Sequence, residues 1–225
     1  MANHLDLEEQ EQLDQIKHFW RQYGNVISWA LIAVLGGLAS WNFYQYWQRS
    51  QATQAAALFD EVERSVMSAD PVKVDRVFEE MKDRFASTLY AQQSALLVAK
   101  QYADSGKHDA AKAALNWLAD QSNDVGYQSL ARLRLVAILM ESKQYDEALA
   151  LLNGTFSPGF EGLVADRKGD VLTLKADKTR AIAEYEKAYR LMDSRTEYRR
   201  LVEVKLNALG VDVQGLNQVA IVSGK

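Results

Sequence analysis

The 225-residue sequence contains no cysteine and three histidines, and each scarcity excludes a class of chemistry. Without cysteine the chain has no disulfide, no zinc–thiolate site and no cysteine nucleophile. The histidines are His4, His18 and His108, and none stands at a diagnostic spacing from a serine or an acid. We therefore expect a protein that is not an enzyme. An enzyme whose catalytic residues are too dispersed to recognise in the sequence stays an alternative.

Two further kinds of motif are missing. No glycine-rich phosphate-binding loop is present, because the paired glycines Gly36 and Gly37 lie inside an apolar run. The acid-rich stretch 75–83 alternates with lysine and arginine, which is typical of a solvated helix face and not of a metal site. We expect neither a cofactor nor a metal.

Basic residues are also not in excess over acidic residues. Residues 1–21 hold five acids and two bases, a net charge of −3, and residues 22–225 hold 25 acids and 24 bases, a net charge of −1. Proteins that bind nucleic acids normally show a basic excess or a basic stripe. The charge balance therefore argues against a nucleic-acid partner.

What the sequence does contain is a long uncharged stretch. No Asp, Glu, Lys or Arg occurs from Gln22 to Gln48, and aromatic side chains gather at both ends of the apolar centre 26–47. About 20 apolar residues suffice to cross a bilayer as a helix, and aromatic rings favour its two interfaces. The sequence predicts a transmembrane helix over 22–47, in contact with membrane lipid. Two alternatives are a buried helix of a soluble core and a cleaved signal sequence, although the acid-rich tail 1–21 lacks a short basic start.

The flanks and the small residues of this segment add two expectations. Lys17 and Arg21 precede it, whereas Arg49 alone follows it closely, so the positive-inside rule favours a cytoplasmic tail 1–21. Small residues four positions apart let a second membrane helix approach closely. They form the predicted surface for membrane helix packing: Ala33, Gly36, Gly37 and Ser40.

Helix punctuation dominates the remainder of the chain. Asp70-Pro71 has the residues of a helix N-cap and first turn, Ser87, Asp124 and Ser194 are further candidate caps, and Gly106, Gly154 and Gly210 are candidate stops. With 48% hydrophobic residues and two prolines, residues 48–210 can bury a substantial core. We expect helical hairpins over 48–210 and a C-terminal tail over 211–225.

Three segments of this region resemble one another. Each segment contains the polar end of one predicted helix, a turn and the start of the next helix. The corresponding alanines in the second helices are Ala111, Ala148 and Ala181. These alanines are 37 and 33 residues apart, close to the period of about 34 residues in tetratricopeptide repeats. An ordinary helical bundle is the alternative.

The residues flanking these alanines resemble the tetratricopeptide family. Small and large residues recur at fixed spacing in the paired helices, as in Gly169 with Leu172 and Ala181 with Tyr185, although the middle copy has Val136 where a small residue is expected. The resemblance implies an all-α fold: a single N-terminal transmembrane helix followed by a tetratricopeptide-like helical-hairpin solenoid. The family's groove positions, carried over to this chain, predict a partner-binding groove lined by Gln93, Leu96, Lys100, Leu130, Leu133, Ala137, Met140, Asp166, Asp170 and Thr173.

The order of features along the chain resembles the bacterial YfgM family, and the segment 17–24 that leads into the apolar stretch is similar to that family's entry segment. The resemblance implies a single-pass protein of the bacterial inner membrane with a periplasmic domain over 48–210. It implies an ancillary subunit of the Sec translocon that binds SecYEG, a periplasmic prolyl isomerase of the PpiD type and unfolded secretory proteins as they emerge. The alternative is a passive membrane-anchored scaffold for another envelope complex.

Overall fold

The computed structural model describes residues 7–213, and within that range the chain is helical and has no strand. The expected all-α class is therefore confirmed for the described residues. The terminal residues 1–6 and 214–225 lie outside this range, and with them most of the predicted tail 211–225. The chain divides into two units, Met1–Thr53 and Gln54–Lys225.

The described part of the first unit belongs to one helix, α1, which spans Leu7–Met67. Along the described residues, α1 alone is long and apolar enough to cross a membrane, and none of its most apolar stretch is buried within the protein. Large side chains such as Leu35, Trp41 and Tyr46 are 60%, 61% and 73% exposed to solvent. A buried helix of a soluble core is thereby excluded, because such a helix would cover these side chains.

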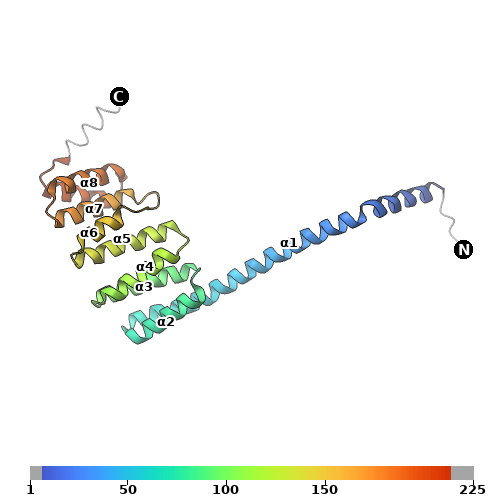
Figure 1. Ribbon diagram of the computed structural model, residues 1–225, viewed down its shortest axis with the longest axis horizontal. Helices are drawn as coiled ribbons and strands as arrows, with labels where there is room; N and C mark the ends of the chain where they lie inside the picture. Colours follow the sequence, from blue (N-terminus) through green and yellow to red (C-terminus); the bar gives the residue numbers. More distant parts are fainter. Residues whose placement is uncertain (1–6, 214–225) are drawn as a thin grey trace, which may run out of the picture. The chain divides into compact units, whose positions relative to one another are not determined.

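The second unit is a row of helical hairpins (Figure 1). Each hairpin has a first and a second helix. The described helices that follow α1 are α2 (Pro71–Phe85), α3 (Leu89–Asp104), α4 (His108–Gln121), α5 (Val125–Glu141), α6 (Tyr145–Leu152), α7 (Glu161–Leu174), α8 (Lys178–Leu191) and α9 (Glu197–Ala208). Helices α3, α5 and α7 are first helices, and α4, α6 and α8 are the second helices paired with them.

Several helix boundaries follow from the expected caps. The carboxylate of Asp70 accepts hydrogen bonds from the backbone N–H groups of Val72 and Lys73, and Asp124 caps α5 in the same way. The cap of α3 is Thr88 and not Ser87, since the hydroxyl oxygen of Thr88 accepts from the N–H of Ala91 at 3.3 Å. At α9 the N-cap is Thr196, two residues after the predicted Ser194.

One turn geometry recurs after successive first helices and sets the repeat register. Residues with left-handed backbone, with φ between +51° and +83°, follow α1, α3, α5, α7 and α9. They are Ala69, Gly106, Lys143, Ala176 and Gly210, which are 37, 37, 33 and 34 residues apart. After four of these helices the next N–H closes the turn on a carbonyl five residues back, as Lys107 does on Tyr102 at 2.8 Å. The end of α1 and the whole of α9 therefore occupy first-helix positions.

The hairpin made by the end of α1 and α2 buries a polar residue in its interior. Ser65 stands where an apolar packing residue is expected, yet its side chain is fully buried. Its hydroxyl donates to the carbonyl of Val62 at 2.8 Å, so burial leaves no unsatisfied group. At the other end, Leu201 is 45% exposed and does not join the buried face that Val202 and Leu206 form on α9.

The hairpins pack small side chains against large ones. Ala111, Ala148 and Ala181 are each 0% exposed. The tightest approach is at Gly169, where an added Cβ atom would lie 2.5 Å from the ring of Tyr185 in α8. A glycine is needed here because any side chain at this position would overlap the ring.

Candidate functional site

The predicted groove residues all lie on first helices, but the structure exposes them unequally. Lys100, Ala137 and Thr173 are exposed, and Gln93, Leu130, Met140 and Asp170 are partly buried. Leu96 and Leu133 retain 9% and 8% exposure, and Asp166 retains none. The groove as a whole stays a prediction, since no partner is present.

Three of the ten residues therefore need correction as lining residues. Leu96 and Leu133 belong to the hydrophobic core. They are buried because large apolar side chains at these positions meet the neighbouring hairpins. Asp166 is buried because side chains of α9 close over it, as described below.

Two of the exposed groove residues, Lys100 and Ala137, line a pocket of about 300 Å³ between α3, α4 and α5. We call it the Arg134 pocket. Its lining residues are Ala99, Lys100, Ala103, Leu115, Arg134, Ala137, Ile138 and Glu141. Most of this lining is aliphatic, and three charged side chains stand among the aliphatic ones. Such a pocket can hold an aliphatic side chain, and its charged groups can bind polar groups next to that side chain.

The three charged groups of the pocket differ in their partners. Lys100 pairs with Asp104 one turn further along α3, at 2.7 Å. The Glu141 carboxylate lies 3.9 Å from the imidazole of His108. Arg134 donates one hydrogen bond, from Nη1 to the carbonyl of Leu96 at 3.1 Å, and makes no ion pair with any described residue. Its partial burial lowers the pKa of the Arg134 guanidinium, and no neighbouring carboxylate opposes that shift.

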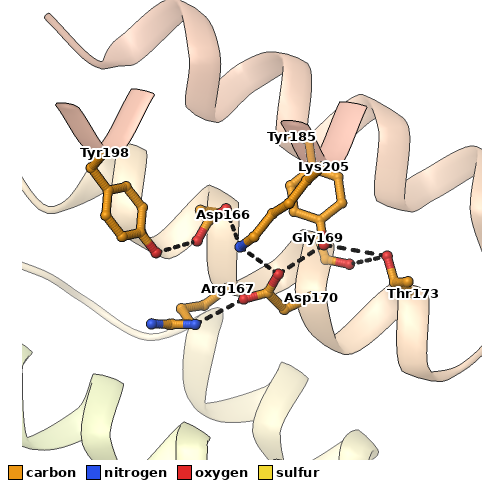
Figure 2. A network of polar contacts seen from close by, with 8 residues as sticks. All are labelled: Asp166, Arg167, Gly169, Asp170, Thr173, Tyr185, Tyr198 and Lys205. Atoms are coloured by element: carbon orange, nitrogen blue, oxygen red, sulfur yellow. Dashed lines mark hydrogen bonds and ion pairs between the residues drawn. The ribbon is translucent and has the colours of Figure 1, made fainter. Parts of the chain in front are cut away.

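A different arrangement occurs where α7, α8 and α9 meet (Figure 2). We call it the α7–α9 network, and its members are Asp166, Arg167, Asp170, Thr173, Tyr185, Tyr198 and Lys205. Lys205 of α9 donates to both Asp166 and Asp170 of α7, at 2.7 and 2.6 Å. One lysine thus links two carboxylates of the preceding first helix.

Tyrosine hydroxyls complete the bonding of these carboxylates. Tyr198 donates to Asp166 at 2.7 Å, and Tyr185 donates to Asp170 at 2.8 Å. Burial and the adjacent carboxylates raise the pKa of Tyr198 far above the usual range. For Tyr185 burial is again the largest cause, and Asp170 adds to the rise in pKa. Both phenols therefore stay protonated and act as hydrogen-bond donors.

Arg167 supplies the second cation of the α7–α9 network. Its Nη1 donates to Asp170 at 2.8 Å. Burial alone would lower the pKa of Arg167, but the carboxylates of Asp170 and Asp166 favour the charged guanidinium, and the pKa is raised. Two cations thus face two carboxylates, which leaves the network neutral and bonded within the protein. Its role is structural: it holds α9 against α7 and α8.

The small residues predicted for membrane helix packing lie on α1. Gly36 and Gly37 have open space around their Cα atoms, with no heavy atom within 4 Å of an added Cβ. The hydroxyl of Ser40 donates to the carbonyl of Gly36 at 2.8 Å within the helix. Membrane helix packing at Ala33, Gly36, Gly37 and Ser40 stays a prediction.

Sequence reasoning missed Arg134, Ile138 and Glu141 as members of a pocket. The spacing of 33 residues between Ala148 and Ala181 already aligns α5 with α7, as does the match of the left-handed Lys143 and Ala176, but spacing does not show that α3, α4 and α5 enclose a pocket. In that register Arg134 corresponds to Arg167, and Ala137 corresponds to Asp170. In the part of the chain that the structure describes, no group of acidic or histidine side chains is arranged to hold a metal.

Comparison with known proteins adds to this geometry. Residues 17–211 match the family model of the tetratricopeptide repeat-like domain. A protein of Neisseria gonorrhoeae is 31% identical over 210 residues, 93% of this chain and 100% of that protein. A Haemophilus influenzae protein is 32% identical over 90% of this chain and 98% of its own length, and an Escherichia coli protein is 24% identical over 90% and 97%. All three are named ancillary SecYEG translocon subunit. No solved structure matches the chain.

Proposed function

Since the chain belongs to the YfgM family, whose members carry a tetratricopeptide repeat-like domain, we propose that it is an ancillary subunit of the Sec translocon in the bacterial inner membrane. The observation that carries this proposal is the similarity over nearly the whole length of relatives that bear this name. The exposed apolar stretch of α1 supports it, because a membrane is the environment that such a stretch requires.

The proposed role is binding and not catalysis. Repeats of helical hairpins present extended surfaces suited to polypeptide partners, and the exposed groove residues lie on such a surface. We propose that the N-terminus is cytoplasmic and that the hairpins are periplasmic. There they bind a prolyl isomerase of the PpiD type and unfolded secretory proteins as these emerge from the translocon.

Topology is tested with a reporter enzyme that is active only outside the cytoplasm. Fused after Lys225 it is expected to be active, and fused before Met1 it is expected to be inactive. A protein-level immunoblot controls for expression of both fusions. The reverse pattern of activity would overturn the periplasmic assignment and the roles that depend on it.

Partner binding is tested by photo-crosslinking in cells. A photoreactive amino acid at Lys100 or Ala137 is expected to capture the isomerase or emerging chains, because both side chains are exposed on first helices. The matched control is Asn116, an exposed residue of the second helix α4. Equal capture at all three positions would contradict a groove on the first helices.

A passive scaffold is the alternative function. It predicts that SecYEG co-purifies with the protein while no chain is captured at Lys100 or Ala137 during secretion. A polar groove would favour this alternative, but the Arg134 pocket has a largely aliphatic lining. Aliphatic lining supports contact with apolar segments of other chains.

A further inference from the structure

The Arg134 pocket contains a cation, Arg134, for which residues 7–213 supply no ion-pair partner. Arg134 is partly buried, carries five N–H donors and uses one of them on the carbonyl of Leu96. The neighbouring charges are Lys100, which faces Asp104, and Glu141, which lies near His108. Neither Asp104 nor Glu141 makes an ion pair with Arg134.

In the neighbouring hairpin the corresponding arginine, Arg167, has a carboxylate partner. Nine residues separate Arg134 from the left-handed Lys143, and nine separate Arg167 from the left-handed Ala176. Three residues after Arg167 the carboxylate of Asp170 accepts its hydrogen bond at 2.8 Å. Three residues after Arg134 stands Ala137, which leaves the corresponding position open to the pocket.

The aliphatic lining defines the second property of a ligand. The small side chains of Ala99, Ala103 and Ala137 leave room in the pocket. Leu115 and Ile138 supply apolar surface. A volume of about 300 Å³ admits one side chain of leucine size together with adjacent backbone. The site therefore combines room for an aliphatic group with an unpaired guanidinium.

We propose that the Arg134 pocket binds a polypeptide segment in which an aliphatic side chain is followed directly by aspartate or glutamate. The aliphatic side chain enters the pocket, and the carboxylate accepts hydrogen bonds from Arg134, as Asp170 does from Arg167. Guanidinium and carboxylate match each other as a planar, charge-assisted pair. This inference rests on the proposed role of the hairpins in binding polypeptide segments.

The test uses the full-length protein in lipid nanodiscs and synthetic peptides with blocked termini. The probes are 12-residue Gly/Ser peptides that carry photo-leucine followed by aspartate, asparagine or lysine. Capture of each peptide after illumination is quantified by mass spectrometry, with empty nanodiscs as background. The parent protein is expected to capture the aspartate peptide about tenfold more than the asparagine peptide, because hydrogen bonds to charged groups are about twice as strong as neutral ones.

Two variants remove this preference by different routes. Arg134→Met removes the cation, and Ala137→Asp gives Arg134 a carboxylate from its own helix while leaving its bond to Leu96 in place. Both are expected to capture the aspartate and asparagine peptides equally. Arg190→Met is the matched control, because Arg190 is exposed on α8 and pairs with Glu186. Circular dichroism of each variant checks folding, and Ala137→Asp carries the test if Arg134→Met fails to fold.

Each outcome decides the inference separately from the proposed function. Equal capture of the aspartate and asparagine peptides by the parent would overturn it, as would a preference that survives Ala137→Asp or a lack of capture altogether. SecYEG is expected to co-purify with the protein in all of these cases if the proposed function is right. Loss of that co-purification in the parent protein would instead refute the proposed function.

Discussion

The hairpins that begin with α5 and α7 share one repeat register, yet their arginines differ in whether they have a carboxylate partner. On α7 two carboxylates, Asp166 and Asp170, bond to the cations Arg167 of α7 and Lys205 of α9 and to the hydroxyls of two tyrosines. In α5 the corresponding Arg134 stands beside Ala137 and lines an open pocket. The same backbone position thus gives a closed lock in one hairpin and a candidate binding site in the other. Two positions of the first helix differ: Ala137 stands where α7 has Asp170, and Leu133 stands where α7 has Asp166.

The largest loss of stability is expected when Lys205, the cation that links the two carboxylates of the α7–α9 network, is replaced. Lys205→Met leaves the fully buried Asp166 without its positive partner. Breaking a buried ion pair on one side typically costs about 3 kcal/mol or more, so we expect the free energy of unfolding to fall by about that amount. Chemical denaturation of the full-length protein measures it.

The matched control is Arg200→Met, which removes an exposed cation from the same helix α9. We expect this substitution to change the free energy of unfolding by close to zero, because Arg200 makes no ion pair with a buried carboxylate among the described residues. Similar destabilisation by the two substitutions would mean that the α7–α9 network does not hold α9 in place.

The second prediction concerns steric closure at the same end. Gly169→Leu places a side chain where even a Cβ atom would lie 2.5 Å from Tyr185. Overpacking typically costs about 1–3 kcal/mol, and we expect the upper part of this range because Tyr185 is also held by Asp170 at 2.8 Å. Thermal unfolding measures the loss, and Ala113→Leu on the exposed side of α4 is the control. If both variants melt together, the close approach of α7 and α8 is wrong.

The two ends also differ in how far the sequence alone predicts them. Small-to-large spacing identified the hairpins and placed Gly169 where two helices meet, because such packing depends on side-chain size, whereas Tyr185 as its neighbour comes from the structure. Asp166 was assigned to a groove surface since its helix position allows it. Its burial depends on Tyr198 and Lys205, which are 32 and 39 residues further along the chain. Contacts of this range depend on how α9 packs, and repeat spacing does not report that packing.

The pocket escaped sequence reasoning for a related reason. Alanines marked the repeats, but the left-handed residues that fix the register are a glycine, a lysine and an alanine after α3, α5 and α7. Lysine and alanine adopt this conformation uncommonly, so the sequence does not mark these turns. The spacing of 33 residues between Ala148 and Ala181 still aligns Arg134 with Arg167 and Ala137 with Asp170. What that spacing does not show is that the side chain of Arg134 bonds to Leu96 on α3 and lines a pocket.

A third prediction uses pH to distinguish the two regions. The pKa values of Tyr185 and Tyr198 are raised by burial and by their carboxylate partners. Unfolded tyrosine ionises near pH 10, so above about pH 10 the unfolded state releases protons that the folded state retains. The stability that the neutral phenols contribute is fully present below pH 10 and is lost as pH rises from there.

Tyr185→Phe and Tyr198→Phe should each make the loss of stability above about pH 10 shallower than in the parent. Tyr127→Phe, on α5, is the control, because no carboxylate bond holds that hydroxyl among the described contacts. Denaturation midpoints between pH 9 and pH 11, taken as differences from the parent, remove the shared titration of lysines. A parent and variants with parallel pH profiles would show that these phenols ionise normally.

The smallest expected effect comes from making α5 resemble α7. Ala137→Asp places a carboxylate three residues after Arg134, as Asp170 stands after Arg167. Arg134 is partly buried but open to the pocket, and Ala137 is exposed, so desolvating the new carboxylate costs little. Ion pairs near the surface contribute about 0.2–1 kcal/mol, and we expect a gain of about 0.5 kcal/mol in the free energy of unfolding. The gain should vanish in Ala137→Asp combined with Arg134→Met, and it should shrink in high salt because exposed charges are screened. A loss of stability on Ala137→Asp would mean that Arg134 does not present its guanidinium to this position, and the two hairpins would then differ in the placement of the arginine side chain as well as in the residues around it.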